Sequence, residues 1–277
     1  MMFLQPAARR VRALRRSPHG TTRKWLSCPH ANRCISTAVA CDAHNDSDEQ
    51  TIRRDLAAAH MLSHAHGFDE LVWNHISARL DANGSFLISP GDQHFDEVTP
   101  QSLIVSSPAN TNITADVIHS AIYKARPDVG AVVHHHTTAV VAVSALQGGL
   151  KFVTQDSAAF FGKVVYHDWE GVSDDYDECS RIAERVADSG AHTVIMRNHG
   201  ALTFGTTVAQ AWVRYYYLDR VCRVQCATQG QPVVQPDAAV LEHAMRQYEG
   251  GGEFSHGKLE WPALLRQAER ARARGGW

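Results

Sequence analysis

Short runs of β-branched residues alternate with amphipathic segments along this chain, and that alternation restricts it to an α/β fold. The clearest strand is GAVVHHH at 130–136, and the longest helical pattern covers 207–229. Further helical patterns lie at 51–66, 113–126 and 174–190, and further strand-like runs lie at 70–80, 85–89, 151–155, 162–169 and 192–205. Because no repeat or linker interrupts this pattern, we expect one α/β domain over residues 50–230, followed by a C-terminal extension at 231–277.

The charges are distributed unevenly along the chain. Of its 27 basic residues, eight lie within residues 1–41, which contain no acidic residue: Arg9, Arg10, Arg12, Arg15, Arg16, Arg23, Lys24 and Arg33. The remainder has 19 basic and 29 acidic residues, a formal net charge of −10. An Arg-rich, acid-free start is typical of a mitochondrial transit peptide, and the alternative is a disordered basic tail on a cytoplasmic protein. The near-neutral overall balance of 27 basic and 29 acidic residues argues against a general nucleic-acid binder, and no apolar run is long enough to span a membrane.

The strand at 130–136 contains three consecutive histidines. Because side chains alternate along a strand, His134 and His136 share one face and His135 points to the other. A third histidine, His199, lies in the sharp turn of RNHG, where another strand ends. Three histidines with an open coordination position are typical of a catalytic zinc site. From spacing alone, an HxH pair is weak evidence for a metal, because paired core or surface histidines are common.

One long segment makes a family resemblance specific. HSAIYKARPDVGAVVHHHTTAVVAVSA, at 119–145, resembles the core of the class II aldolase/adducin family. The resemblance continues through HISAR at 75–79, ISPGDQHFDEVT at 88–99, YHDWEG at 166–171 and RNHGALTFG at 197–205. It covers about residues 50–230 in the same order.

This resemblance implies a three-layer α/β/α fold and a homotetramer with active sites at the subunit interfaces. It also implies a Zn²⁺ or another divalent transition metal, held by His134, His136 and His199. In enzymes of the fuculose-phosphate aldolase type, the metal binds a hydroxy-carbonyl substrate and stabilises the enediolate that forms when a carbon–carbon bond breaks.

The sequence departs from those aldolases at the proton-transfer position. Their catalytic Glu lies four residues before a helix histidine, and the corresponding residue before His119 is Ala115. Asp116 is adjacent, but one residue along a helix is a rotation of about 100°. Asp116 is therefore either a catalytic candidate or an acid that complements the helix dipole. We expect His119 itself to be a core histidine, and His60, His64 and His66 to be solvated surface residues.

The phosphate-binding loops are altered as well. His75 replaces an Asn, although Ser77 and Arg79 remain as substrate-binding candidates. The turn that reads Pro-Thr-Gly in the aldolases is here Pro90-Gly91-Asp92, and an Asp at this position repels a phosphate dianion. We therefore expect an unphosphorylated substrate. These departures resemble the adducin-like branch of the family.

Tyr166 and His167 fall where the aldolases present an acid from the neighbouring subunit. They are catalytic candidates, and an interface hydrogen bond is the alternative role.

The leading hypothesis is a metal-dependent carbon–carbon lyase that acts on a small hydroxy-carbonyl compound. The alternative is a non-catalytic adducin-type module for self-association and actin contact, which the three retained histidines disfavour. An epimerase shares the fold but is expected to keep the phosphate loops.

Overall fold

The computed structural model describes residues 46–107, 110 and 112–275. The chain divides into two units, Met1–Asp42 and Ala43–Trp277, and every described residue belongs to the second. The expected presequence at 1–41 therefore lies outside the described residues. The α-helices of the described part are α1 (Asp46–Ala65), α2 (Ile113–Ala125), α3 (Thr138–Ser144), α4 (Tyr176–Val186), α5 (Val208–Ala227), α6 (Ala238–Glu249) and α7 (Glu260–Gly275). Two short 3₁₀ turns, η1 (Phe95–Glu97) and η2 (Asp156–Phe160), lie between them.

The strands form one mixed sheet in the order β3-β2-β1-β4-β7-β6-β5. They are β1 (His75–Arg79), β2 (Phe86–Ile88), β3 (Ile104–Val105), β4 (Ala131–His135), β5 (Val164–His167), β6 (Thr193–Met196) and β7 (Gly200–Gly205). Only β5 and β6 pair in parallel, and the other pairs in this sheet are antiparallel. In the centre, β4 pairs with β1 on one side and with β7 on the other, so His134 lies opposite His75 and Leu202.

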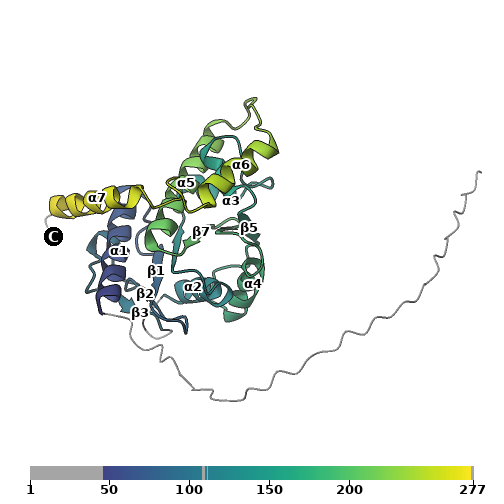
Figure 1. Ribbon diagram of the computed structural model, residues 1–277. Coiled ribbons are helices and arrows are strands. Elements are labelled where there is room, and N and C mark those ends of the chain that lie inside the picture. The colour runs from purple at the N-terminus through teal and green to yellow at the C-terminus, as the bar shows by residue number, and fades with distance from the viewer. Residues whose placement is uncertain (1–45, 108–109, 111, 276–277) are drawn as a thin grey trace, which may run out of the picture. The chain divides into compact units, whose positions relative to one another are not determined.

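Helices cover both faces of the sheet, as Figure 1 shows. One apolar core joins α1, α5 and α7 to the sheet, and a second joins α2 and α4 to its opposite face. Along β4, Val133 packs into the first core and Val132 into the second, as the alternation of a strand requires. The predicted α/β/α single-domain fold is confirmed.

Helix α2 begins at Ile113 because Asn112 caps it: the Asn112 side-chain oxygen accepts a hydrogen bond from the backbone N–H of Thr114. Thr114 lies inside the helix, and its hydroxyl donates to the same Asn112 oxygen at 3.0 Å. The helix ends at Ala125, two residues before Pro127.

One expected strand is absent, and one observed helix was not expected. Residues 151–155 form no strand: Lys151 N donates to Gln225 Oε1 and Thr154 N donates to Ser157 Oγ, so side chains accept these backbone hydrogen bonds. Helix α6, in the extension, was not expected from its polar sequence. It is held by Glu249, which pairs at 2.8 Å with the buried guanidinium of Arg214 on α5. None of the helices in the described ranges is both long and apolar enough to cross a bilayer.

Candidate metal centre

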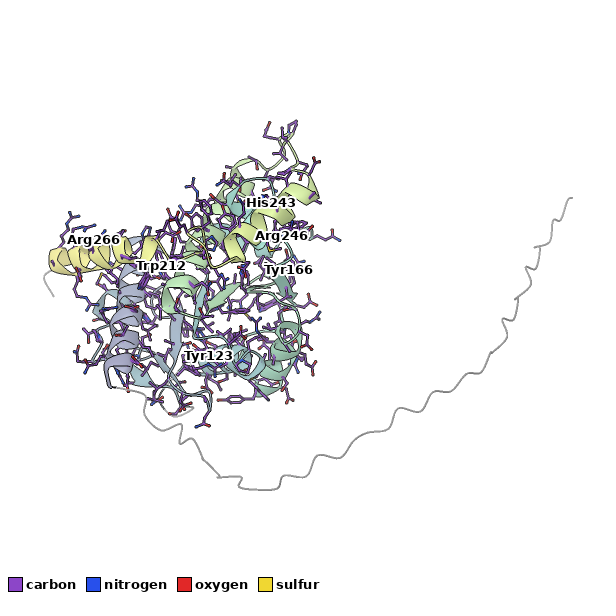
Figure 2. The ribbon with its side chains drawn as sticks, viewed as in Figure 1. Tyr123, Tyr166, Trp212, His243, Arg246 and Arg266 are labelled. Carbon is purple, nitrogen blue, oxygen red and sulfur yellow. The ribbon has the colours of Figure 1, made fainter. Side chains whose placement is uncertain are left out.

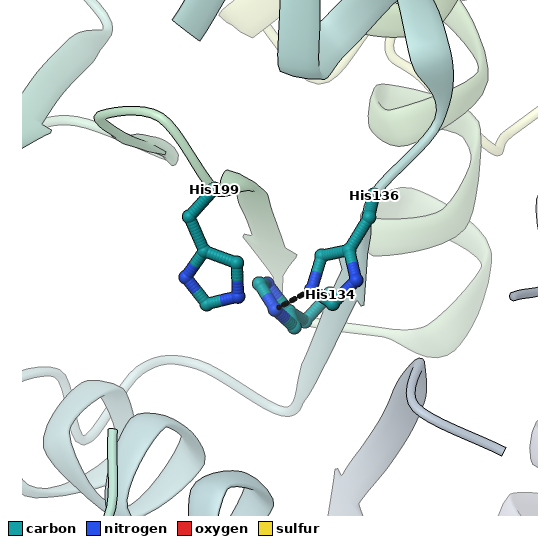
Figure 3. Close-up of side chains that lie close together, drawn as sticks. All are labelled: His134, His136 and His199. Carbon is teal, nitrogen blue, oxygen red and sulfur yellow. Dashed lines mark hydrogen bonds between the residues drawn. The ribbon is translucent and has the colours of Figure 1, made fainter. Parts of the chain in front are cut away.

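Three imidazole rings converge where β4 ends and β7 begins. His134 and His136 come from β4 and the residue after it, and His199 comes from the turn before β7. One ring nitrogen from each lies within 4.8 Å of the others, and their rings face one another in Figure 3. The alternation predicted for the HxH pair is therefore confirmed. His135 points to the other face, where its Nε2 lies 3.0 Å from the Ser63 hydroxyl of α1.

The turn that carries His199 depends on two backbone features. Asn198 adopts a positive φ of 59°, a conformation that Asn tolerates better than most residues. Gly200 follows, and a Cβ atom there would lie 2.7 Å from the His135 carbonyl oxygen and 2.8 Å from the His136 ring. The NHG sequence thus lets β7 approach β4 closely enough to bring the third histidine to the other two.

Hydrogen bonds fix which nitrogens of His134 and His136 are free. His136 Nδ1 donates to the Glu70 carboxylate at 2.7 Å, and His134 Nδ1 donates to the Ala201 carbonyl at 3.2 Å. Because both partners only accept, each Nδ1 carries a proton, and the two Nε2 atoms lie toward each other at 2.8 Å. Carboxylate and carbonyl partners of this kind are usual behind metal-bound histidines.

The environment favours the neutral form of His134 and His199. Burial, with the nearby His136, holds the pKa of His134 well below its ordinary value. Burial and His136 also lower the pKa of His199 to about 4. His199 Nδ1 is buried without a hydrogen-bond partner among the described residues. Neutral imidazole is the form that binds a metal, so this donor set fits a divalent transition ion.

The three histidines form one wall of a cavity of about 420 Å³. Its other described lining residues are Glu70, Trp73, His75, Thr114, Trp169, Gly171, Val172, Ser173 and Asn198. Glu70 is the charged carboxylate of this set, and no Lys or Arg is among these described lining residues. Trp73 and Trp169 are 56% and 62% exposed, so these two lining residues form an apolar rim at the mouth of the cavity.

Of the three substrate-binding candidates, the structure brings one to the cavity. His75 lines it, and its ring stacks on the His134 ring with the centroids 4.8 Å apart. Ser77 is fully buried behind His75 and contacts His119 and Tyr123. Arg79 donates to the backbone carbonyls of Tyr123, Arg126 and Val129 at the end of α2.

Asp116 does not line the cavity. Its carboxylate accepts hydrogen bonds from Ser106 at 3.0 Å and from Tyr176 of α4 at 2.7 Å. Ala115 is buried in the core between α2 and α4, and Thr114 is the residue of this turn that reaches the cavity.

Tyr166 and His167 also lie away from the cavity of their own chain. Tyr166, a residue of β5, accepts a hydrogen bond from Leu150 N, and Figure 2 shows it apart from Tyr123 of α2. His167 is buried and its Nε2 lies 3.0 Å from the Glu178 carboxylate. The role predicted for these two residues is in the site of a neighbouring subunit, so it applies only to an oligomer.

Sequence reasoning missed Glu70, Thr114 and the two rim tryptophans. Glu70 lies in a loop, 66 positions before His136 in the sequence. The available sequence signal was its position five residues before the HISAR motif at 75–79. His119 is a buried core histidine, as expected. The expectation that His60 is solvated is wrong, because this residue of α1 is fully buried and its Nδ1 donates to the Leu56 carbonyl oxygen at 2.8 Å.

Comparison with known proteins agrees with this geometry. The family model of the class II aldolase and adducin N-terminal domain matches residues 54–226. A Caulobacter vibrioides protein named "Putative aldolase class 2 protein" is 36% identical over 237 residues, which cover 80% of this chain and 90% of that protein. Alpha-adducin of Rattus norvegicus is 31% identical over 84% of this chain, but the match covers 35% of adducin's own length.

Among solved structures, the L-fuculose 1-phosphate aldolase of Glaciozyma antarctica PI12 superposes with a TM-score of 0.71. That protein is 27% identical, and the match covers 83% of this chain and 92% of that one. The seven-stranded sheet, the family match and these relatives agree, and the chain belongs to the class II aldolase and adducin N-terminal domain family.

Proposed function

We propose that this chain is a metal-dependent aldehyde-lyase, which makes or breaks a carbon–carbon bond beside a hydroxy-carbonyl group. The observation that carries the proposal is the cluster of ring nitrogens from His134, His136 and His199 in the cavity wall, where the Nε2 atoms of His134 and His136 lie 2.8 Å apart. His134, His136 and His199 would hold Zn²⁺ or another divalent transition ion, and Glu70 would orient His136. When bound, such an ion supplies Lewis-acid stabilisation for negative charge on the substrate oxygens.

The substrate we propose is small and unphosphorylated. The described lining of the cavity offers Glu70 and imidazoles but no Lys or Arg to meet a phosphate dianion. Trp73 and Trp169 at the rim favour an apolar group on the part of the substrate that points outward.

The assembly we propose is a homotetramer in which Tyr166 and His167 contribute to the site of an adjacent subunit. Asp116 is engaged by Ser106 and Tyr176, so it is a weaker candidate for the proton-transfer group. Light scattering on the purified protein should give the mass of four chains, and a monomer would contradict this assignment.

Two reactions test the lyase proposal: exchange of solvent deuterium into dihydroxyacetone, and aldehyde release from unphosphorylated ketols and hydroxy acids. We expect the zinc-loaded protein to catalyse at least one of them, and the double variant His134→Ala/His136→Ala to lose it. His243→Gln is a matched control, because His243 is an exposed histidine on α6. If the fully metal-loaded protein catalyses neither reaction, the lyase proposal is wrong.

The similarity to alpha-adducin favours a second candidate, a non-catalytic module for self-association and actin binding. Cosedimentation with filamentous actin distinguishes the two. A metal-loaded protein that pellets with actin but catalyses neither reaction is the result expected for this module.

We also propose that residues 1–41 direct the chain to mitochondria, because they combine eight basic residues with no acid. A fusion of residues 1–45 to a fluorescent reporter should colocalise with mitochondria. A cytosolic reporter would contradict the proposal.

A further inference from the structure

A continuous series of hydrogen bonds runs from the cavity into the core between β1 and α2. His75 Nδ1 lies 2.7 Å from His119 Nε2, His119 Nδ1 lies 2.5 Å from Ser77 Oγ, and Ser77 Oγ lies 2.8 Å from Tyr123 Oη. All four residues are buried, and His75 alone of the four lines the cavity of the candidate metal centre. Because Nδ1 of His75 is occupied by His119, Nε2 is the ring nitrogen left for the cavity.

The far end of this series sets its direction. Among the described residues, Ser77 is the hydrogen-bond partner of Tyr123 Oη, and the Arg79 guanidinium, 4.7 Å above the Tyr123 ring, can only donate. Burial raises the pKa of the Tyr123 phenol, so the phenol keeps its proton. The Tyr123 hydroxyl therefore donates to Ser77.

The donor and the acceptor of each following hydrogen bond can then be assigned in turn. Ser77, which accepts from Tyr123, donates its own proton to His119 Nδ1. Burial lowers the pKa of His119 to about 3, so this ring is neutral and carries its proton on Nε2, which donates to His75 Nδ1. A neutral His75 then carries its proton on Nε2, facing the cavity.

We propose that His75 is a hydrogen-bond donor to a substrate oxygen, and that Tyr123, Ser77 and His119 are positioning residues that hold its Nε2–H toward the cavity. The His75 ring stacks on the His134 ring, so this donor lies beside the candidate metal ligands. It suits a carbonyl, hydroxyl or carboxylate oxygen next to the metal-bound group. A neutral imidazole that donates to a developing oxyanion is a known means of catalysis. The nature of the ligand rests on the proposed lyase function, but the direction of the hydrogen bonds does not.

The tautomer of His75 can be measured without substrate. Long-range ¹⁵N–¹H spectra of the ¹⁵N-histidine-labelled full chain report which ring nitrogen carries the proton, and loss of one set of signals in His75→Gln assigns His75. We expect a protonated Nε2 and a bare Nδ1. A protonated Nδ1, or a mixture of the two forms, overturns the proposal.

The positioning residues are tested by variants of His119 and Tyr123. His119→Gln keeps an N–H where His119 Nε2 lies, whereas His119→Phe removes it, and Tyr123→Phe removes the hydroxyl that sets the direction. We expect the His75 tautomer to stay fixed in His119→Gln and to become mixed in His119→Phe and Tyr123→Phe. Ser120→Ala, at the neighbouring position of α2, should leave it unchanged. An unchanged His75 tautomer in both Phe variants contradicts the role of the series.

Calorimetric titration of the zinc-loaded protein with glycolate tests the ligand. Loss of one neutral hydrogen bond should weaken binding about five- to tenfold in His75→Phe and His119→Phe, with recovery in His119→Gln. Equal affinity in all variants overturns the donor role of His75. If the zinc-loaded wild type binds no glycolate while His75 carries its proton on Nε2, the proposed substrate class fails and the assignment of the hydrogen bonds stands.

Discussion

Both carboxylate oxygens of Asp116 are engaged by hydroxyl groups from other elements. Ser106 donates to one oxygen and Tyr176 of α4 to the other, and Asp116 is only 8% exposed. Its surroundings are those of a side chain that joins α2 to α4. Asp116 does not line the cavity, so its carboxylate is not placed to reach a substrate bound there.

Asp116→Asn should therefore lower stability and leave catalysis nearly unchanged. One of its two carboxylate oxygens becomes an NH₂ group that faces a hydroxyl, and this should reduce the free energy of unfolding by about 1–3 kcal/mol. Urea denaturation measures this change, and deuterium exchange at matched metal content should stay within about twofold of wild type. A loss of exchange of 100-fold or more at unchanged stability would identify Asp116 as the base.

His60 makes the stability of the chain depend on pH. Burial lowers its pKa to about 4, whereas an unfolded chain has a histidine pKa of about 6.5. Between these two pKa values the unfolded state binds a proton and the folded state does not, so the free energy of unfolding falls as the pH drops from about 6.5 toward about 4. At pH 5, one such histidine lowers the free energy of unfolding by about 2 kcal/mol relative to its value at neutral pH.

The slope of unfolding free energy against pH, measured by urea denaturation between pH 7 and pH 5, should become smaller in His60→Gln. His243→Gln, which changes an exposed histidine, should keep the wild-type slope. An identical slope in His60→Gln and wild type would show that His60 takes up protons in the folded state as readily as in the unfolded one.

At the scale of elements, the site depends on how closely β7 approaches β4. Gly200 begins β7, and a methyl group there would meet the His135 carbonyl oxygen at 2.7 Å, which is backbone and cannot turn aside. Gly200→Ala should push the two strands apart and separate His199 from His134 and His136. Because misplaced ligand shells cost about 10–100-fold in metal affinity, we expect a loss in that range.

Competition with a zinc-chelating dye measures that affinity. Gly148→Ala is the matched control, because a Cβ atom there meets nothing within 4 Å. Wild-type zinc affinity in Gly200→Ala would contradict the importance of the close approach.

Patterns of neighbouring residues predicted those strands and helices whose packing depends on residues close together in the sequence. The alternation Val132, Val133, His134 and His135 is enough to place the two neighbouring histidines on opposite faces of β4. Residues 151–155 also resemble a strand in sequence, yet the backbone N–H of Lys151 donates to the side chain of Gln225, 74 positions away. Helix α6 was missed because its anchor, the contact between Glu249 and Arg214, joins residues 35 positions apart.

The distance in sequence between contacting residues also decides which residues of the candidate metal centre could be predicted. His134, His136 and His199 follow from strand alternation, one turn motif and a family resemblance. Glu70, by contrast, contacts His136 from 66 positions away, and His75 contacts His119 across 44 positions. No periodicity of a strand or helix spans such separations, so only the folded chain brings these pairs together.

At the scale of the whole molecule, the candidate metal centre joins parts of the chain that are otherwise separate. It lies where β4, the turn before β7 and the loop that carries Glu70 meet, with α2 behind His75. A ligand that binds only the folded state stabilises it, by about 2.7 kcal/mol at 100 times its dissociation constant. Metal binding should therefore be visible both in composition and in stability.

The most direct measurement is the metal content of the purified full-length chain, determined by elemental analysis after removal of loosely bound ions. We expect roughly one transition-metal ion per chain, and almost none in His134→Ala/His136→Ala. The wild-type protein should also melt at a lower temperature after chelation, whereas the double variant should not respond. A wild-type metal content near zero, or an equal content in the double variant, would contradict the assignment of His134, His136 and His199 as a metal centre.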